Sequence, residues 1–276
     1  MEFLTSLPAW VLFAGSILFF AGLAAGLSIF LHGRFPNQSG APYAHTAEYY
    51  NTVIGALFAF LTAFLINSAY STVRSTNEIV AAEAAAANRV AWATRGLPSA
   101  DVSAVQESLA RYLSALETKE WPHLGEPTSV ESGEAGTESE LATPELNDLQ
   151  QQVFEVGSRP YVPPLSAEAL QSAVDDLGSE RRARLAAANS VLPFSLFALA
   201  VISGIALITN LIVTTLRDGP RASIVSGGIV LVVALDIALI LGVTAPFDGP
   251  FTVKVDPIVT LFEEISNGRY LPWARS

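Results

Sequence analysis

The fold of this chain is decided by the run from Tyr49 to Thr94, which reads YYNTVIGALFAFLTAFLINSAYSTVRSTNEIVAAEAAAANRVAWAT. Its first part, Tyr49 to Val73, contains no charged residue and can cross a hydrocarbon core about 30 Å thick at 1.5 Å per helical residue. From Thr76 the run is rich in the helix formers Ala and Glu, and it stops at Gly96-Leu97-Pro98. Because no Pro or Gly interrupts residues 56–95, the run predicts one helix of about 45 residues that leaves the membrane unbroken.

Three more apolar runs of about 20 residues or more mark further membrane spans. They extend from Ala9 to Leu31, from Val191 to Leu216, and from Ala222 to Ala245, the last with Asp236 as its one charged residue. A signal peptide is the competing interpretation of the first run, but Met1 to Pro8 supplies no Lys or Arg before it. The sequence therefore predicts an all-α polytopic membrane protein with four transmembrane helices.

Composition excludes several classes of function. Hydrophobic residues make up 51% of the 276 and charged residues only 15%, against roughly 25% in a soluble domain. The chain has no cysteine and its three histidines have no ligand spacing, so no disulfide, metal site or cofactor is expected. The net charge of -11 disfavours nucleic acid as a partner, and no nucleotide-binding or hydrolase motif supports an enzyme.

Four spans divide the chain into four regions. Residues 1–73 carry the first two spans and an outer loop, residues 74–190 form a large helical insert, residues 191–245 carry the last two spans, and residues 246–276 form a tail. More of the basic residues near span ends lie on the side of the insert and both termini than on the other side. The positive-inside rule therefore predicts a multi-pass protein of the inner (plasma) membrane whose insert and termini are cytoplasmic.

The insert is predicted to be helical around one acidic loop. Ser99 can cap a helix that ends near Trp121-Pro122, and Thr143-Pro144 is typical of the start of another. Residues 122–143 lie between them, hold five glutamates and no Lys or Arg, and have a composition typical of disorder. We expect a cytosolic helical bundle that is coupled to the spans, either for gating or for assembly.

The second span has small and polar residues roughly along one face, next to bulky aromatic residues. Such a helix can line a pore with a hydrophobic constriction, for which Phe58 and Phe64 are the candidates. The alternative is close helix packing through small side chains, which is routine in membranes. The pore-lining candidates are Gly55, Phe58, Ala59, Thr62, Phe64 and Asn67.

Asp236 lies near the middle of the fourth span, where a charged carboxylate costs about 2.5 to 3.5 kcal/mol on insertion scales. One interpretation is an ion or proton site that faces the bundle interior, with Asn67, Thr209 or Asn210 as partners. The other is a protonated carboxyl group in an interhelical hydrogen bond.

Arg181, Arg182 and Arg184 form a basic group at the membrane face, just before the third span. One interpretation is that these arginines steer anions or contact a pore mouth. The other is that they bind lipid headgroups and fix the topology of the chain in the bilayer.

Three stretches of the sequence have a pattern that is shared with a known protein family. They are Tyr50 to Leu97, the segment from Arg111-Tyr112 to Glu120-Trp121-Pro122, and the tail Ala245-Pro246-Phe247-Asp248-Gly249-Pro250-Phe251-Thr252-Val253. Together, over most of the chain, they resemble the bestrophin-like family of membrane proteins. Bestrophins proper are oligomeric ion channels with a pore lined by the second span, so the resemblance implies a homo-oligomer with that span around a central axis. The run of acids that forms the calcium clasp of animal bestrophins is absent, which disfavours calcium gating.

The leading hypothesis is a homo-oligomeric channel for inorganic ions in the lipid bilayer. Residues 74–190 hold 18 acidic and 9 basic residues, a balance that concentrates cations if these side chains face a vestibule. The alternative is a non-conducting membrane scaffold or sensor that recruits a partner through its cytosolic insert. A proton-coupled transporter that uses Asp236 is a third hypothesis, for which no inverted repeat is detectable.

Overall fold

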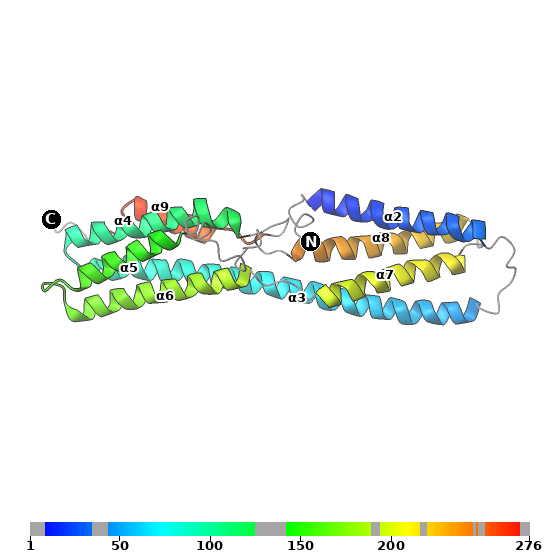
Figure 1. Cartoon of the computed structure of the whole chain (residues 1–276), viewed down its shortest axis with the longest axis horizontal. Coiled ribbons are helices and arrows are strands. Elements are labelled where there is room, and N and C mark those ends of the chain that lie inside the picture. Colours follow the sequence, from blue (N-terminus) through cyan, green and yellow to red (C-terminus); the bar gives the residue numbers. More distant parts are fainter. Residues whose placement is uncertain are drawn as a thin grey trace. The chain divides into compact units, whose positions relative to one another are not determined.

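A computed structural model describes residues 9–34, 44–124, 142–188, 194–215, 220–244, 247 and 252–270. Within these residues it contains eight α-helices and no strand, so the predicted all-α class is confirmed (Figure 1). Four of the helices are long and apolar enough to cross a membrane. The predicted disordered loop falls mainly on residues 125–141, which lie outside the described residues.

The chain divides into two compact units. Unit 1 comprises residues 1–72 and 191–252, and unit 2 comprises residues 73–190 and 253–276. Helix α3 (Ala44–Ala93) is the uninterrupted helix that the sequence predicts, and it belongs to unit 1 up to Thr72 and to unit 2 from Val73.

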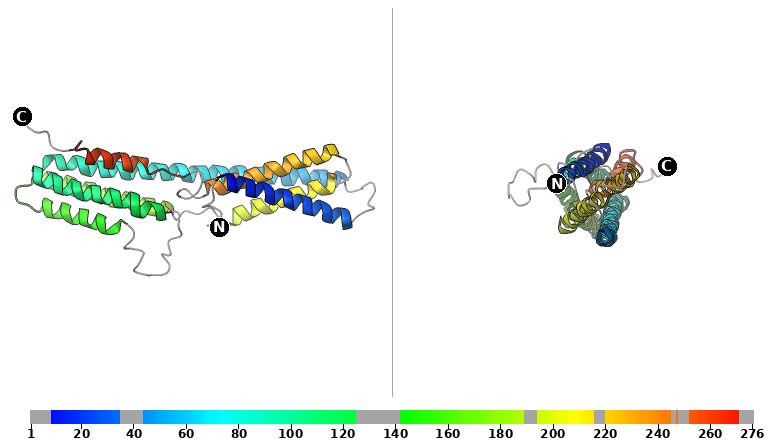
Figure 2. Two further views of the ribbon diagram at one scale, coloured as in Figure 1. Left: turned by 90° about the horizontal axis from the view of Figure 1, so that it is seen from above. Right: turned by 90° about the vertical axis from the view of Figure 1, so that its right-hand side faces the viewer.

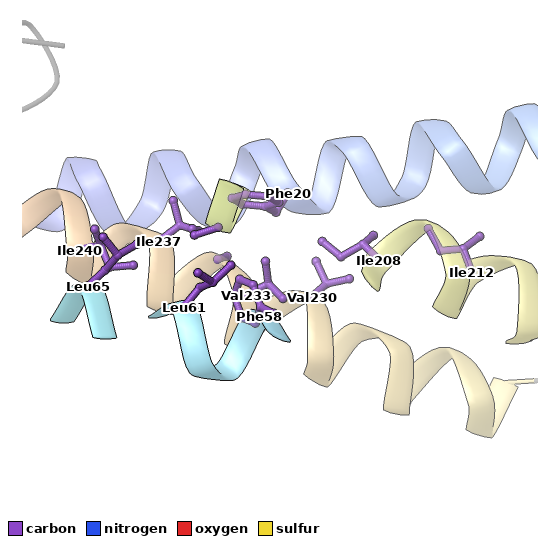
Figure 3. Packing of buried hydrophobic residues seen from close by; sticks show 12 residues of the cluster. Phe20, Phe58, Leu61, Leu65, Ile208, Ile212, Val230, Val233, Ile237 and Ile240 are labelled. Atoms are coloured by element: carbon purple, nitrogen blue, oxygen red, sulfur yellow. The ribbon is translucent and has the colours of Figure 1, made fainter. Parts of the chain in front are cut away.

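Unit 1 is a bundle of apolar helices. It contains α2 (Ala9–Arg34), α7 (Phe194–Thr215), α8 (Pro220–Val243) and the first part of α3. Helix α2 packs along α8, and α7 contacts both of them. The buried cluster comprises Phe20, Phe58, Leu61, Leu65, Ala200, Ile208, Ile212, Val230, Val233, Ala234, Ile237 and Ile240 (Figure 3).

Close packing in unit 1 is sharpest at Gly204 of α7. A Cβ atom there would lie 3.0 Å from Val233 Cγ1 of α8 and 3.1 Å from Phe58 Cε2 of α3. The glycine therefore lets three helices approach closely, as small residues do in membrane proteins.

Unit 2 is a second helical bundle. It contains the later part of α3, α4 (Ser99–Ala115), α5 (Thr143–Gly157), α6 (Pro164–Ala188) and α9 (Asp256–Ser266) (Figure 2). Helix α5 packs on α4 and α6, and α9 packs on α4. The core is built from apolar stripes at helical spacing. Its fully buried members include Val90, Val102, Val105, Leu109, Leu149, Leu170, Val174, Leu177 and Ile258.

Two local signals in unit 2 agree with helix chemistry. Pro144 lies in the first turn of α5, where its missing N–H is harmless, and Glu145 adds negative charge near that helix N-terminus. Gly268 follows α9 with a φ of 74°, a left-handed conformation that glycine adopts without steric cost.

The end of α4 departs from regular α-helix. A π-helical turn, Leu116–Glu120, follows α4 directly, and a 3₁₀ turn, Trp121–His123, follows the π-helical turn. The wider π turn changes which side chains face the core, and the Glu120 side chain is fully buried.

Candidate functional site

In unit 1, helix α3 turns one face to its own bundle and leaves the opposite face uncovered. The buried face carries Phe58, Leu61, Thr62, Leu65 and Ala69, and the uncovered face carries Val53, Phe60, Phe64, Asn67 and Tyr70. At 100° per residue, Asn67 lies about 180° around the helix from Phe58. The two faces of this part of α3 therefore lie in different environments in the single chain.

The structure separates the six pore-lining candidates into two groups. Phe58 is 4% exposed and packs near Gly204, and the Thr62 hydroxyl donates to the Phe58 carbonyl oxygen at 2.9 Å. Gly55 faces α7, where a Cβ atom would lie 3.7 Å from Leu207 Cδ1. The remaining candidates, Ala59, Phe64 and Asn67, are exposed in the single chain.

Asp236 is not brought together with its predicted partners. Thr209 donates to a carbonyl oxygen of its own helix, and Asn210 Nδ2 donates to Asn51 Oδ1 of α3 at 2.9 Å. Within the described residues, neither Asp236 nor Asn67 has a hydrogen bond or ion pair. Two polar side chains of the membrane unit therefore lack a partner in the part of the chain that the structure describes.

The three arginines before the third span lie in different environments. Arg182 is exposed, whereas Arg181 and Arg184 are buried. Arg181 Nη2 donates to Glu120 at 2.6 Å, and Arg184 Nε donates to Glu83 at 2.5 Å. Arg184 Nη2 also donates to Glu120, so this carboxylate is shared by two guanidinium groups.

These ion pairs belong to a larger buried cluster in unit 2, which we call the arginine–glutamate network. Its members are Glu83, Tyr112, Glu120, Arg181 and Arg184. The Tyr112 hydroxyl donates to Glu83 at 2.8 Å.

The network also holds the start of α5. The Ala142 N–H donates to Glu120 at 3.0 Å, and Arg181 Nη2 donates to the Thr143 hydroxyl at 2.9 Å. The network therefore connects α3, α4, the π-helical turn, α5 and α6.

Each charge in the network is stabilised by its neighbours. Burial alone would raise the pKa of Glu120, but the guanidinium groups of Arg184 and Arg181 more than offset this and lower it. Burial, reinforced by the Glu83 charge, raises the pKa of Tyr112 well above its ordinary value. The carboxylates of Glu83 and Glu120 outweigh the effect of burial on Arg184 and raise its pKa. The Tyr112 phenol is therefore neutral beside the ion pairs of the network.

Sequence reasoning did not single out Glu83 or Glu120 as partners of the arginines. A usable signal lies in α6, where Leu170, Val174 and Leu177 form a buried stripe with spacings of four and three residues. Arg181 and Arg184 continue that spacing, whereas Arg182 does not. In the described part of the chain, no group of three or more His, Cys, Asp or Glu side chains could hold a metal ion.

The architecture is similar to that of solved membrane proteins. Two point variants of a bacterial bestrophin homologue from Klebsiella pneumoniae match with TM-scores of 0.69 and 0.67 at 12% and 14% identity. The matches cover 92% and 91% of this chain, and 99% and 98% of the respective homologue chains. A third structure, a membrane protein with a point mutation, gives a TM-score of 0.65 at 13% identity, over 92% of this chain and 97% of its own. At these identities the likeness concerns the fold.

Family membership follows from the sequence match. No curated protein matches the chain. The model of the Bestrophin-like domain matches residues 18–258, which is most of the chain. This multi-pass membrane protein therefore belongs to the bestrophin-like family.

Proposed function

We propose that the protein is a homo-oligomeric ion channel in which the uncovered face of α3 in every copy lines a central aqueous passage. The family supports this proposal, because bestrophins proper are oligomeric channels with a pore lined by the second span. The observation that carries it is the position of Asn67, which has no hydrogen-bond partner among the residues that the structure describes.

Asn67 carries a primary amide with two donor hydrogens and an acceptor oxygen. Asn67 precedes Arg74, the first charged residue after the uncharged residues 49–73, by seven residues. This spacing places the two residues about 10 Å apart along the helix. An unsatisfied polar group in hydrocarbon costs several kcal/mol, so a lipid environment for this face is unfavourable. An aqueous passage supplies the missing hydrogen bonds without any partner side chain.

The same face offers a hydrophobic constriction. Phe60 and Phe64 are exposed in the single chain and lie one helical turn apart, on the side of Asn67 that is more distant from Arg74. In a symmetric ring of copies, the Phe60 side chains form one layer of aromatic rings around the passage, and the Phe64 side chains form a second layer one helical turn away. Such constrictions close by excluding water, and this exclusion is the barrier to permeation. Phe58 contributes to packing instead.

We propose inorganic cations as the permeant ions. The exposed acids on α5 and α6 include Asp148, Glu155, Glu168 and Asp175. The buried arginines of the arginine–glutamate network are matched one for one by Glu83 and Glu120, so they add little positive potential. The surplus of acids in residues 74–190 therefore raises the local cation concentration. In this proposal the protein lies in the inner membrane, with unit 2 and both termini in the cytoplasm.

The absence of cysteine makes the test direct. The test compares two variants, Asn67→Cys and the control Leu18→Cys, each purified and reconstituted in liposomes. Leu18 lies on α2 and is 73% exposed. We expect cation flux above that of empty liposomes for both. A water-soluble thiol reagent should block flux through Asn67→Cys and leave Leu18→Cys and the wild type unchanged. No wild-type flux at any tested pH and calcium concentration, or no block at position 67, refutes the proposal.

A further inference from the structure

We infer that the carboxyl group of Asp236 makes a hydrogen bond to a second copy of this chain, at the seam between α8 and α3. The inference rests on the proposed assembly, in which α3 of each copy faces the axis. It assigns Asp236 to an interface between subunits instead of a bond inside one subunit or a place in the passage.

The position of Asp236 around α8 defines the seam. At 100° per residue its nearest neighbours around the helix include Val232 on one side and Ile240 on the other. Val232 is exposed, whereas Ile240 is fully buried and packs near Leu65 of α3 (Figure 3). Asp236 therefore lies where the face of α8 that packs on α3 meets the face that none of the described helices covers.

The carboxyl group lacks a partner at this position. It is partly exposed, and no residue in the described ranges bonds to it. The neighbouring exposed side chains of α8, Leu231, Val232 and Leu235, are apolar and attract no water. Because a carboxyl group in hydrocarbon needs a hydrogen-bond partner in either protonation state, neither the described residues of this chain nor lipid satisfies Asp236.

The geometry of a ring supplies the missing partner. If α3 of every copy faces the axis, the helices beside α3 must adjoin the next copy. Helix α8 is one of these, because Ile237 and Ile240 of α8 belong to the same buried cluster as Leu61 and Leu65 of α3. The seam that contains Asp236 then faces the adjacent subunit, where membrane helices commonly form hydrogen bonds between polar groups.

The first experiment measures assembly of the full chain in detergent by native mass spectrometry over a dilution series. Asp236→Leu should raise the dissociation constant per interface by about threefold to fifteenfold, the range expected for one interhelical hydrogen bond. Asp236→Asn keeps hydrogen-bonding capacity and should stay within about twofold of the wild type. Leu18→Ala, at an exposed residue of α2, is the control and should also assemble normally.

A second measurement decides the question if Asp236→Leu fails to fold. Asp236→Cys introduces the only thiol in the chain, and its rate of reaction with a lipid-soluble maleimide is compared between oligomer and dissociated monomer. We expect at least about tenfold protection in the oligomer, with equal rates in both states for Leu18→Cys. Equal rates at position 236, or wild-type assembly of Asp236→Leu, overturn the inference.

Failure of this inference can be told apart from failure of the channel proposal. A wild-type protein that is monomeric at all concentrations refutes both. An oligomer that conducts but is indifferent to Asp236→Leu refutes the seam contact alone. An oligomer that weakens with Asp236→Leu yet never conducts refutes the channel alone.

Discussion

Arg184 of α6 donates from Nε to the carboxylate of Glu83 on α3 at 2.5 Å, and the two side chains are 0% and 1% exposed. Their positions in the sequence differ by 101 residues. Both charged groups are buried away from water, so each is stabilised by the other. Arg184 is further stabilised by its hydrogen bond to Glu120. The pair therefore fixes α6 against α3 within unit 2 through an interaction whose loss is costly.

Removing Arg184 should destabilise the protein far more than removing its exposed neighbour. Arg184→Met leaves Glu83 and Glu120 short of positive charge in the core, which we expect to lower the free energy of unfolding by about 3–5 kcal/mol. The matched control Arg182→Met should change it by no more than about 0.5 kcal/mol. Thermal or chemical unfolding in detergent, followed by tryptophan fluorescence, measures both. Equal stability of the two variants would contradict a structural role for the network.

The network should also make stability depend on pH. The pKa of Glu120 is lowered in the folded protein, so this carboxylate stabilises the fold above its ordinary pKa of about 4.5. That contribution is lost as the pH falls below 4.5 toward the folded value. We expect the unfolding midpoint of the wild type to drop in this range, measured between pH 7 and pH 3.

Glu120→Gln provides the control for the pH dependence. It should be less stable than the wild type at pH 7, because Arg181 then loses the carboxylate with which it pairs and Arg184 keeps only Glu83. The difference between the two proteins should shrink as the pH falls. A constant difference from pH 7 to pH 3 would show that Glu120 ionisation does not contribute.

The membrane helices could be predicted because their signals are local. Span length and the absence of charge in residues 49–73 are sufficient to identify a transmembrane helix, and the Ala/Glu-rich continuation shows that α3 does not stop at the membrane. The start of α5 likewise follows from Thr143-Pro144. None of these predictions requires knowledge of a distant contact.

The arginine–glutamate network could not be assigned in the same way. Glu120 and Arg184 are 64 positions apart, and the π-helical turn that brings Glu120 into the core has no recognisable sequence signature. The same limit applies to Phe58 and Phe64. Both were candidates for one constriction, but they are six residues apart, so their positions around α3 differ by about 120°. Only the packing of α7 and α8 shows which of the two is covered.

Truncation of the two phenylalanines should therefore have opposite consequences. Phe64, 49% exposed, is proposed to narrow the passage, so Phe64→Ala should raise ion flux severalfold with little loss of stability. Phe58→Ala opens a cavity in the core of unit 1 and should cost about 3–5 kcal/mol of stability without widening the passage. Liposome flux and thermal unfolding of both variants test this. Higher flux from Phe58→Ala than from Phe64→Ala would place the constriction on the other face.

Two glycines in membrane helices should tolerate substitution very differently. Gly204→Val must displace Val233 or Phe58, and overpacking of this kind costs about 1–3 kcal/mol. Gly22→Val on α2 meets no atom within 4 Å of its new Cβ and should be close to neutral in the single chain. Unfolding midpoints of the two variants provide the comparison. A Gly22→Val variant as unstable as Gly204→Val would indicate that α2 is covered in the assembly.

Deletion of residues 126–140 from the acidic loop should distinguish a channel from a scaffold. A hydrogen bond already connects the two sides of this segment, because the Ala142 N–H donates to Glu120 at 3.0 Å. Arg181 of α6 also donates to Thr143 at 2.9 Å and so holds the start of α5. Replacing residues 126–140 by a short Gly-Ser linker should therefore leave the unfolding midpoint unchanged, since loop length has only a weak effect on closure entropy. A channel keeps its flux in liposomes after this deletion. Loss of a co-purifying protein partner, with no flux before or after the deletion, would favour the scaffold.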